Sequence, residues 1–177
     1  MEHMRHTDYF EEPLDEVQLR YASEMSGIDI ESVRCYVKEW FVQAPLPLLL
    51  GCRYPGLVPF LAQAHSKGIT LGVLSDYPAE EKLNRLEVRK YFQAVTAAGD
   101  AGIGCYKPHP KGLLAVLEML AVRPEQALYI GDRVEVDAEA ARRAGVRCFI
   151  IGRSSSPGMH WMGAKDYFEL GRLIGLG

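Results

Sequence analysis

The chain has 177 residues, which fits one ordinary domain with room for a small subdomain. Apolar residues make up 48% of the chain and charged residues 24%, proportions that exclude a disordered or fibrous protein. The net charge is -3 and there is no basic block, so the sequence predicts no nucleic-acid or anionic-membrane partner and favours small-molecule chemistry.

Targeting signals and cysteine motifs are not found in this sequence. No apolar run approaches the length needed to cross a bilayer, and the first ten residues lack the apolar core of a signal peptide, so a cytoplasmic location is expected. The cysteines form no CxxC pair and are predicted to be buried free thiols: Cys35, Cys52, Cys105 and Cys148.

The first fifty residues predict a pair of helices, over residues 17–26 and 30–42. Gly27 is expected to end the first helix, and Asp29 to cap the second. The second helix has apolar residues at helical spacing, which predicts a buried face: Val33, Tyr36, Val37, Trp40 and Phe41. Prolines and glycines between residues 45 and 56 then predict a linker.

From Tyr54 onward, short apolar runs alternate with segments of helical pattern. The expected strands cover residues 69–74, 94–97, 127–130 and 146–151. The expected helices cover residues 57–66, 80–91, 110–120 and 137–144, with a closing helix near the end of the chain. Buried strands separated by helices indicate an α/β fold, with a parallel sheet covered by helices on both faces.

Polar residues follow the expected strands where each one ends. Ser75 and Asp76 follow one strand, Asp132 and Asp137 follow another, and Lys107 lies in a glycine-rich loop between them. Ligands of open parallel sheets bind beyond the carboxyl ends of the strands, so these side chains are expected to meet there. Carboxylates that suit Mg²⁺, together with a lysine and a hydroxyl that can hold phosphate oxygens, indicate phosphoryl transfer.

These segments carry a family resemblance. VLSD (Val73–Asp76), KPHP (Lys107–Pro110) and IGDRVEVD (Ile130–Asp137) resemble, in order and spacing, the second, third and fourth motifs of the haloacid dehalogenase superfamily. The resemblance covers roughly Tyr54 to Ile151 and is closest to the phosphoglycolate-phosphatase-like branch with a helical cap. It implies a Rossmann-like parallel sheet, with residues 1–52 as part of the α-helical cap and residues 53–177 as the core.

The resemblance also implies roles for the motif residues. Ser75 and Asp76 would lie at the phosphate-binding position, and Lys107 would neutralise phosphate and nucleophile. Asp132 would bind Mg²⁺ directly, with Asp137 in the first or second coordination shell. The implied protein is a Mg²⁺-dependent phosphatase acting on a small phosphorylated metabolite. The oligomeric state is not predicted.

The first motif of the family is not found. That motif is a strand ending in DxDx[TV], whose first aspartate is the nucleophile. Asp8 follows no apolar strand, and Asp29 is better explained as a helix cap, so no nucleophile is assigned. The first strand is central in the sheet of this family, so its loss would leave two unpaired edges. The strand could be missing because the chain is N-terminally shortened, because a second chain supplies it, or because the protein is an inactive relative.

Alternative interpretations stay open at this stage. A dehalogenase of the same fold shares the serine and lysine, although the acidic pair argues against it, and a non-catalytic binding module would explain the missing nucleophile. A receiver domain is more distant, since its early acidic pair is also missing. Taken singly, Ser75–Asp76 is a strand-to-helix turn, Asp132 and Asp137 complement a helix N-terminus, and Lys107 is a surface lysine. Only their joint order favours a phosphatase site.

Overall fold

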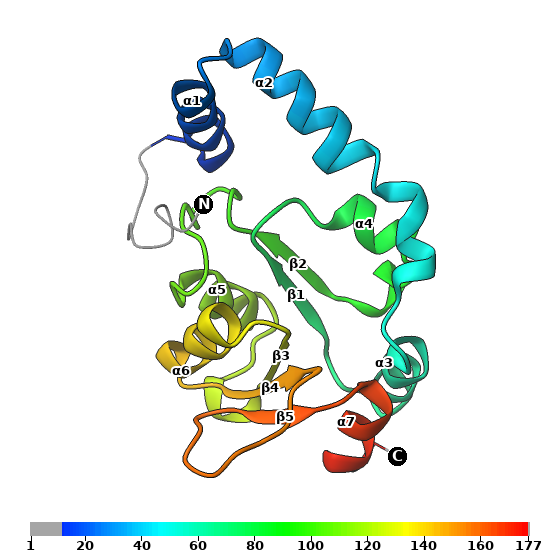
Figure 1. Ribbon diagram of the computed structural model, residues 1–177. Helices are drawn as coiled ribbons and strands as arrows, with labels where there is room; N and C mark the ends of the chain where they lie inside the picture. Colours follow the sequence, from blue (N-terminus) through cyan, green and yellow to red (C-terminus); the bar gives the residue numbers. More distant parts are fainter. Residues whose placement is uncertain (1–11, 177) are drawn as a thin grey trace.

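The computed structural model describes residues 12–176, and its secondary structure alternates between helices and parallel strands (Figure 1). The strands are β1 (Gly72–Ser75), β2 (Ala94–Ala97), β3 (Leu128–Gly131), β4 (Arg147–Ile151) and β5 (Met162–Ala164). The α-helices are α1 (Leu14–Ser26), α2 (Ile30–Tyr36), α3 (Leu57–Ser66), α4 (Glu80–Arg85), α5 (Lys111–Met119), α6 (Glu139–Ala144) and α7 (Tyr167–Leu173). The predicted α/β class is confirmed.

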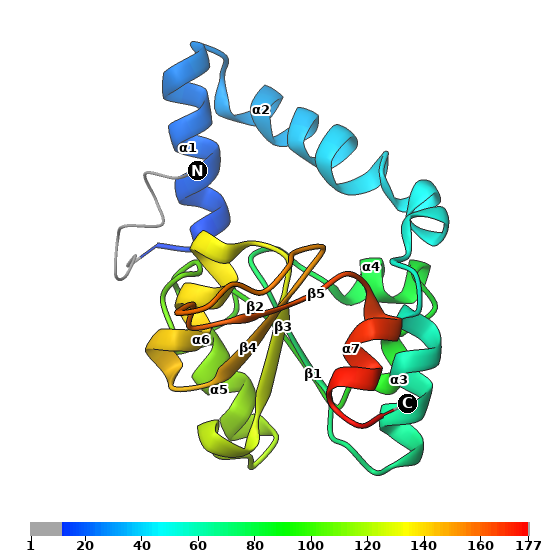
Figure 2. The ribbon, with the colours of Figure 1, turned by 60° about the horizontal axis from the view of Figure 1, so that its bottom comes forward.

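The strands form two separate parallel sheets within the described residues. One has the order β1-β2, with Gly72 opposite Ala94, and the other has the order β3-β4-β5, with Leu128 opposite Arg147. β1 and β3 are therefore each paired on one side only. Figure 2 shows these two edge strands facing each other across the middle of the molecule.

Helices cover both faces of the strands. In β4, Phe149 and Ile151 pack into one apolar cluster with α3 and α7, while Cys148 and Ile150 pack into a second cluster with α5 and α6. Alternate residues of a strand point to opposite faces, so a strand buried on both faces reads as a continuous apolar run. β1 and β3 contribute to the same two clusters, which places both sheets in one layer between the helices.

The predicted helical hairpin before the sheet is confirmed. α1 ends at Gly27, whose φ of +69° is left-handed, a conformation that glycine adopts without strain. The Asp29 carboxylate accepts the Ser32 N–H (2.9 Å) and so caps α2. The Arg34 guanidinium forms a forked pair with Glu16 (2.8 and 2.9 Å), which joins the two helices.

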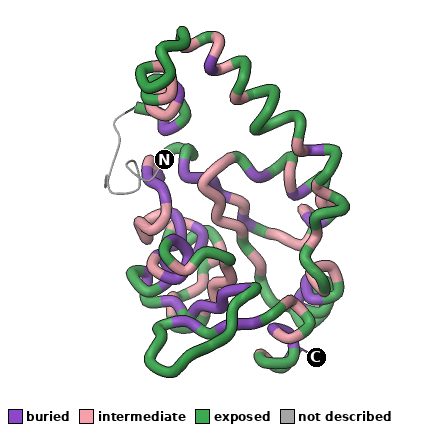
Figure 3. Tube along the Cα trace, in the orientation of Figure 1, coloured by how far each residue is buried: buried purple, intermediate pink, exposed green. Residues whose placement is uncertain are grey.

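The predicted buried face of the second helix is wrong. Of its apolar residues only Val33 is buried, whereas Tyr36, Trp40 and Phe41 are 55%, 60% and 74% exposed. Helical spacing shows that residues share a face, but not that a neighbouring element covers that face. Here the helix continues as the π-helical segment η2 (Val37–Gln43), in which no residue is buried, and Figure 3 shows this part of the chain as mostly exposed.

Three smaller predictions also need correction. The expected linker contains a 3-10 helix, η3 (Leu46–Cys52), because proline is tolerated in the first turn of a helix. Cys35 and Cys52 are exposed rather than buried, whereas Cys105 and Cys148 are buried free thiols as predicted. The edge strand β5 was not predicted, since it is short and lies in a segment rich in glycine and serine.

Candidate active site

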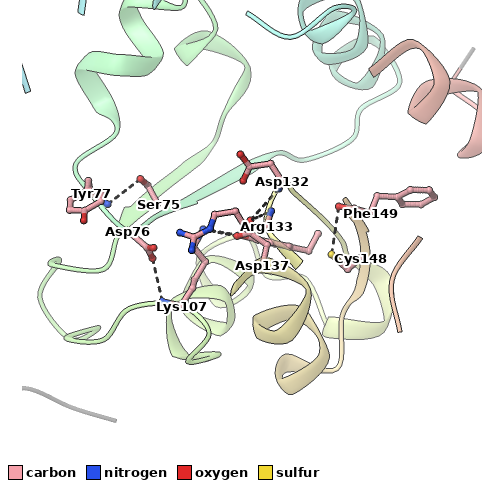
Figure 4. Close-up of polar contacts among 10 residues, drawn as sticks. Ser75, Asp76, Tyr77, Lys107, Asp132, Arg133, Asp137, Cys148 and Phe149 are labelled. Carbon is pink, nitrogen blue, oxygen red and sulfur yellow. Dashed lines mark hydrogen bonds and ion pairs between the residues drawn. The ribbon is translucent and has the colours of Figure 1, made fainter. Parts of the chain in front are cut away.

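The residues singled out in the sequence lie where the two sheets end. Figure 4 shows Ser75 and Asp76 at the carboxyl end of β1, Asp132 and Asp137 after β3, and Lys107 between them. Two contacts of Lys107 join the sheets: its backbone N–H donates to Asp76 Oδ1 (3.3 Å), and its ammonium donates to Asp137 Oδ1 (2.7 Å). The expected meeting of strand ends is therefore present in the fold.

The Lys107–Asp137 ion pair is the most buried one among the described residues. The Lys107 side chain is 14% exposed and the Asp137 side chain 3% exposed. A buried pair carries a desolvation cost that only good geometry and further hydrogen bonds offset. A pair this buried is not a chance contact between surface side chains. It therefore marks a position where the fold holds charged groups in a fixed arrangement.

Asp137 uses both of its carboxylate oxygens within the protein. Oδ1 accepts hydrogen bonds from Lys107 and from the Tyr129 hydroxyl (3.1 Å), and Oδ2 accepts the backbone N–H groups of Asp132 (3.1 Å) and Arg133 (3.0 Å). Burial alone would raise the pKa of Asp137, but the Lys107 charge and these hydrogen bonds hold the pKa below its ordinary value. Asp137 is thus a fixed anion that orients its neighbours.

Asp132 has the opposite electrostatic setting. Asp132 as a whole is exposed, but its carboxyl group is partly desolvated. This desolvation is the larger cause that raises the pKa of Asp132 above its ordinary value, and the nearby Asp137 charge is the second. Because Asp132 lies close to the negatively charged Asp137, binding of a cation near the two carboxylates would be electrostatically favourable. Asp132 therefore offers an exposed carboxylate at the end of the site.

The donor set fits Mg²⁺ only in part. Carboxylate oxygens are the hard ligands that Mg²⁺ prefers, and Asp132 provides them. Both carboxylate oxygens of Asp137 already accept hydrogen bonds from protein groups. This favours a role for Asp137 in positioning the metal ligands rather than in binding the metal itself. In residues 12–176 no three His, Cys, Asp or Glu side chains gather into a metal site.

Ser75 and Asp76 are fixed by their own turn. The Ser75 hydroxyl oxygen accepts the Tyr77 backbone N–H (3.2 Å), and the Ser75 carbonyl accepts the Ala98 N–H (2.9 Å). Asp76, predicted at the phosphate position, directs its carboxylate to the Lys107 backbone. Asp76 therefore secures the lysine loop, while the Ser75 hydroxyl lies at the strand end and, among residues 12–176, donates to no protein group.

Sequence reasoning missed two contributions to the site. Tyr129 in β3 donates to Asp137 and lies 3.4 Å from the Lys107 ammonium, and burial raises the pKa of its hydroxyl well above its ordinary value. A tyrosine inside an apolar strand needs a partner for its hydroxyl, which was an available signal. The helix α1 also reaches the site, because Gln18 donates to the Tyr77 hydroxyl (3.1 Å) and accepts from Tyr106 (3.4 Å).

Parallel strands between helical layers, with a lysine–aspartate pair across the strand ends, define an α/β fold with a cluster of charged side chains at the strand ends. Residues 8–145 match the family of haloacid dehalogenase-like hydrolases. The chain belongs to this family, as the motif resemblance implied.

The curated relatives are phosphatases. The chain is 35% identical over 124 residues to the glyceraldehyde 3-phosphate phosphatase of Methanopyrus kandleri, covering 67% of this chain and 52% of that protein. It is 35% identical to the phosphoserine phosphatase of Thermus thermophilus (59% and 42%) and to the phosphoglycolate phosphatase of Salmonella typhimurium (52% and 36%). The chain thus spans about half the length, or less, of these relatives.

Solved structures show the same fold. A phosphatase from Thermococcus onnurineus superposes with a TM-score of 0.64 at 24% identity, covering 96% of this chain and 94% of the other. The β-phosphoglucomutase of Clostridium difficile gives a TM-score of 0.65 at 19% identity, covering 83% and 64%. In the described residues, no helix is both long and apolar enough to cross a membrane.

Proposed function

We propose that the chain carries the site of a Mg²⁺-dependent phosphatase that acts on a small phosphorylated metabolite. The observation that carries this proposal is the buried Lys107–Asp137 pair, which joins the ends of β1 and β3 beside Ser75 and Asp132. The names of the relatives support the same chemistry, since each is a phosphatase of a small phosphorylated compound.

Each residue receives a role from its position. The Ser75 hydroxyl would donate a hydrogen bond to a phosphoryl oxygen, and the Lys107 ammonium would offset charge on the phosphoryl group. Asp132 would hold Mg²⁺, and Asp137 would keep Lys107 and the Asp132 backbone in place. When bound, Mg²⁺ would supply further charge stabilisation on the phosphoryl oxygens.

The nucleophile is the group that this site still needs. The sequence has no DxDx[TV] strand that would provide a nucleophilic aspartate. We infer that the 177-residue chain has little or no turnover until an aspartate is supplied there. The hairpin of α1 and α2 would act as part of a cap, because Gln18 already contacts the site loops.

Binding and turnover of the chain test this proposal separately. Calorimetry with Mg²⁺ should give a binding signal that Asp132→Asn removes, while Glu118→Gln, on an exposed position of α5, keeps it. Phosphate release from p-nitrophenyl phosphate should be negligible with or without Mg²⁺. Strong release by the chain alone that Asp132→Asn abolishes would contradict the missing nucleophile, and Mg²⁺ binding unchanged in Asp132→Asn would contradict the metal role.

A non-catalytic binding module is the second candidate. The missing nucleophile favours it, together with the lack of a three-carboxylate cluster in the described part of the chain. This candidate predicts phosphate binding with no turnover even after an aspartate strand is added. A dehalogenase is disfavoured, because it needs no metal and would not use the exposed Asp132 carboxylate.

A further inference from the structure

The Tyr129 hydroxyl closes a ring of three hydrogen bonds in the candidate site. The Lys107 ammonium donates to Asp137 Oδ1 (2.7 Å) and to the Tyr129 hydroxyl oxygen (3.4 Å), and the Tyr129 hydroxyl donates to the same Oδ1 (3.1 Å). Figure 4 shows the Lys107 side chain directed at Asp137 near the ends of the strands. Each of the three groups thus contacts the other two.

The position of Tyr129 is held by packing that does not depend on its hydroxyl. Tyr129 lies in β3 opposite Cys148 of β4, and it packs against an apolar cluster that includes Leu113 of α5 and Ala141 of α6. Because the phenol oxygen lies on the axis of the ring, fixing the ring also fixes that oxygen. The hydroxyl is therefore a fixed point for the flexible side chain of Lys107.

The Tyr129 hydroxyl keeps its proton in this setting. Burial, followed by the nearby Asp137 charge, raises the pKa of Tyr129 well above its ordinary value. Tyr129 is therefore a neutral phenol, which donates to Asp137 and accepts from Lys107 at the same time. A phenylalanine at this position would keep the packing of the ring and lose both hydrogen bonds.

Lys107 has a second carboxylate within electrostatic reach. Its charge lowers the pKa of Asp132, against the desolvation and the Asp137 charge that raise it. An ammonium is a compact charge on a flexible stem with three rotatable N–H groups, so it can move between two nearby carboxylates. In this structure Lys107 pairs with Asp137, and the two N–H groups that it uses in the ring with Tyr129 set the direction of the third.

We propose that Tyr129 is a positioning residue, whose hydroxyl retains the Lys107 ammonium at Asp137 and keeps it from pairing with Asp132. The result is a division of charge at the site, in which Lys107 serves an anion and the Asp132 carboxylate serves a cation. The placement of Lys107 stands on the hydrogen bonds of the ring. Only its use toward a phosphoryl group rests on the proposed function.

The ammonium signal of Lys107 tests this placement directly. Nitrogen-15 NMR at low temperature detects lysine ammonium groups whose hydrogen bonds slow proton exchange with water, and Lys107→Arg identifies the signal by removing it. Tyr129→Phe should shift or broaden the signal, because the ammonium loses one acceptor. Tyr91→Phe is the matched control and should leave the signal unchanged, since Tyr91 precedes β2, at the opposite end of that strand from Ser75.

Two results of this measurement contradict the proposal. A Lys107 signal that is lost to exchange in the unaltered chain would show that the ring of hydrogen bonds does not hold the ammonium. A signal that is the same in Tyr129→Phe as in the unaltered chain would show that the hydroxyl does not place it. Loss of the fold in Tyr129→Phe, seen in the amide spectrum, would assign the hydroxyl a structural role and overturn the proposal as well.

Binding of inorganic phosphate tests the consequence for the site. In chelator-treated buffer, calorimetry should show about three- to tenfold weaker binding in Tyr129→Phe, the range expected for the loss of one hydrogen bond. In an Asp132→Asn background the same substitution should change the affinity less than about twofold, because no second carboxylate competes for Lys107. An equal loss in both backgrounds would mean that Tyr129 acts only through the fold, which sinks the positioning role.

The two measurements also separate this inference from the proposed function. If the unaltered chain binds no phosphate while the Lys107 signal responds to Tyr129→Phe, the placement of Lys107 stands and the phosphatase proposal is contradicted. If phosphate binds but neither the signal nor the affinity responds to Tyr129→Phe, the phosphatase proposal stands and the positioning role is wrong.

Discussion

The two kinds of strand in this protein differ in burial although their sequences look alike. β4 has partners on both sides, and Phe149, Ile150 and Ile151 are at most 4% exposed. β1 and β3 are equally apolar runs with helices on both faces, yet every residue in them is only half-buried or exposed. The difference lies in the slot alongside them, a cavity of about 690 Å³ lined by residues of β1 and β3, so burial of a strand depends on its lateral neighbours as well as on the helices that cover it.

The same two sheets also meet at the candidate site. The β3-β4-β5 sheet provides Asp132 and Asp137, the β1-β2 sheet provides Ser75 and Asp76, and Lys107 contacts an aspartate on each side. The candidate site is therefore shared between two sheets that are not hydrogen-bonded to each other in the described residues.

Amide exchange should show the largest contrast. Amides of Phe149 and Ile150 in β4 should exchange through global unfolding, whereas those of Gly72 and Leu74 should exchange through small fluctuations at the open edge. We expect the rates to differ by about a thousandfold or more, measured by native-state hydrogen exchange of the chain alone. Similar protection in both strands would mean that the open edge is already occupied in solution.

Breaking the ion pair between the two sheets should have the next largest effect. Lys107→Ala leaves Asp137 buried without its counter-charge and should lower the free energy of unfolding by about 3–5 kcal/mol. Arg142→Ala is the control, because its pair with Glu139 is on the surface and should contribute about 1 kcal/mol or less. Urea unfolding measures both, and equal losses would contradict the structural role of the buried pair.

Core truncation should distinguish the closed strand from the open one. Ile150→Ala in β4 removes a fully buried side chain and should cost about 2–5 kcal/mol. Ile130→Ala in β3 removes a half-buried side chain beside the slot and should cost about half of that or less. If Ile130→Ala is as costly in urea unfolding as Ile150→Ala, β3 is more enclosed than its burial indicates.

The pH dependence of stability should reflect the two aspartates with opposite signs. The lowered pKa of Asp137 contributes stability above the ordinary aspartate pKa of 3.8, and this contribution is lost as pH falls through the lower folded value. The raised pKa of Asp132 contributes stability at acid pH that is lost as pH rises through the folded value.

In chelator-treated buffer at pH 7, Asp132→Asn should therefore raise the midpoint of urea unfolding slightly and Asp137→Asn should lower it. Glu118→Gln serves as the control and should leave the midpoint unchanged. A lower midpoint for Asp132→Asn would show that its carboxylate stabilises the fold without a metal.

The sequence predicted strands and helix ends well where residues close together in the chain determine them. The apolar runs that became β2, β3 and β4 fall within a residue or two of their expected bounds, and Gly27 and Asp29 end and begin their helices as predicted. Short-range rules decide such features, because strand alternation, capping and the backbone freedom of glycine depend on neighbouring residues. The site residues Ser75, Lys107 and Asp132 were also named from motif order at strand ends.

Only the tertiary structure decided which faces are covered and which atoms meet. Trp40 and Phe41 belong to the predicted buried face, yet they are 60% and 74% exposed, because the apolar spacing of a helix does not specify which element covers it. The Tyr129 hydroxyl on Asp137 and the slot between β1 and β3 join segments far apart in the chain. Long-range contacts of this kind depend on how the layers assemble, and that information is not local to any stretch of sequence.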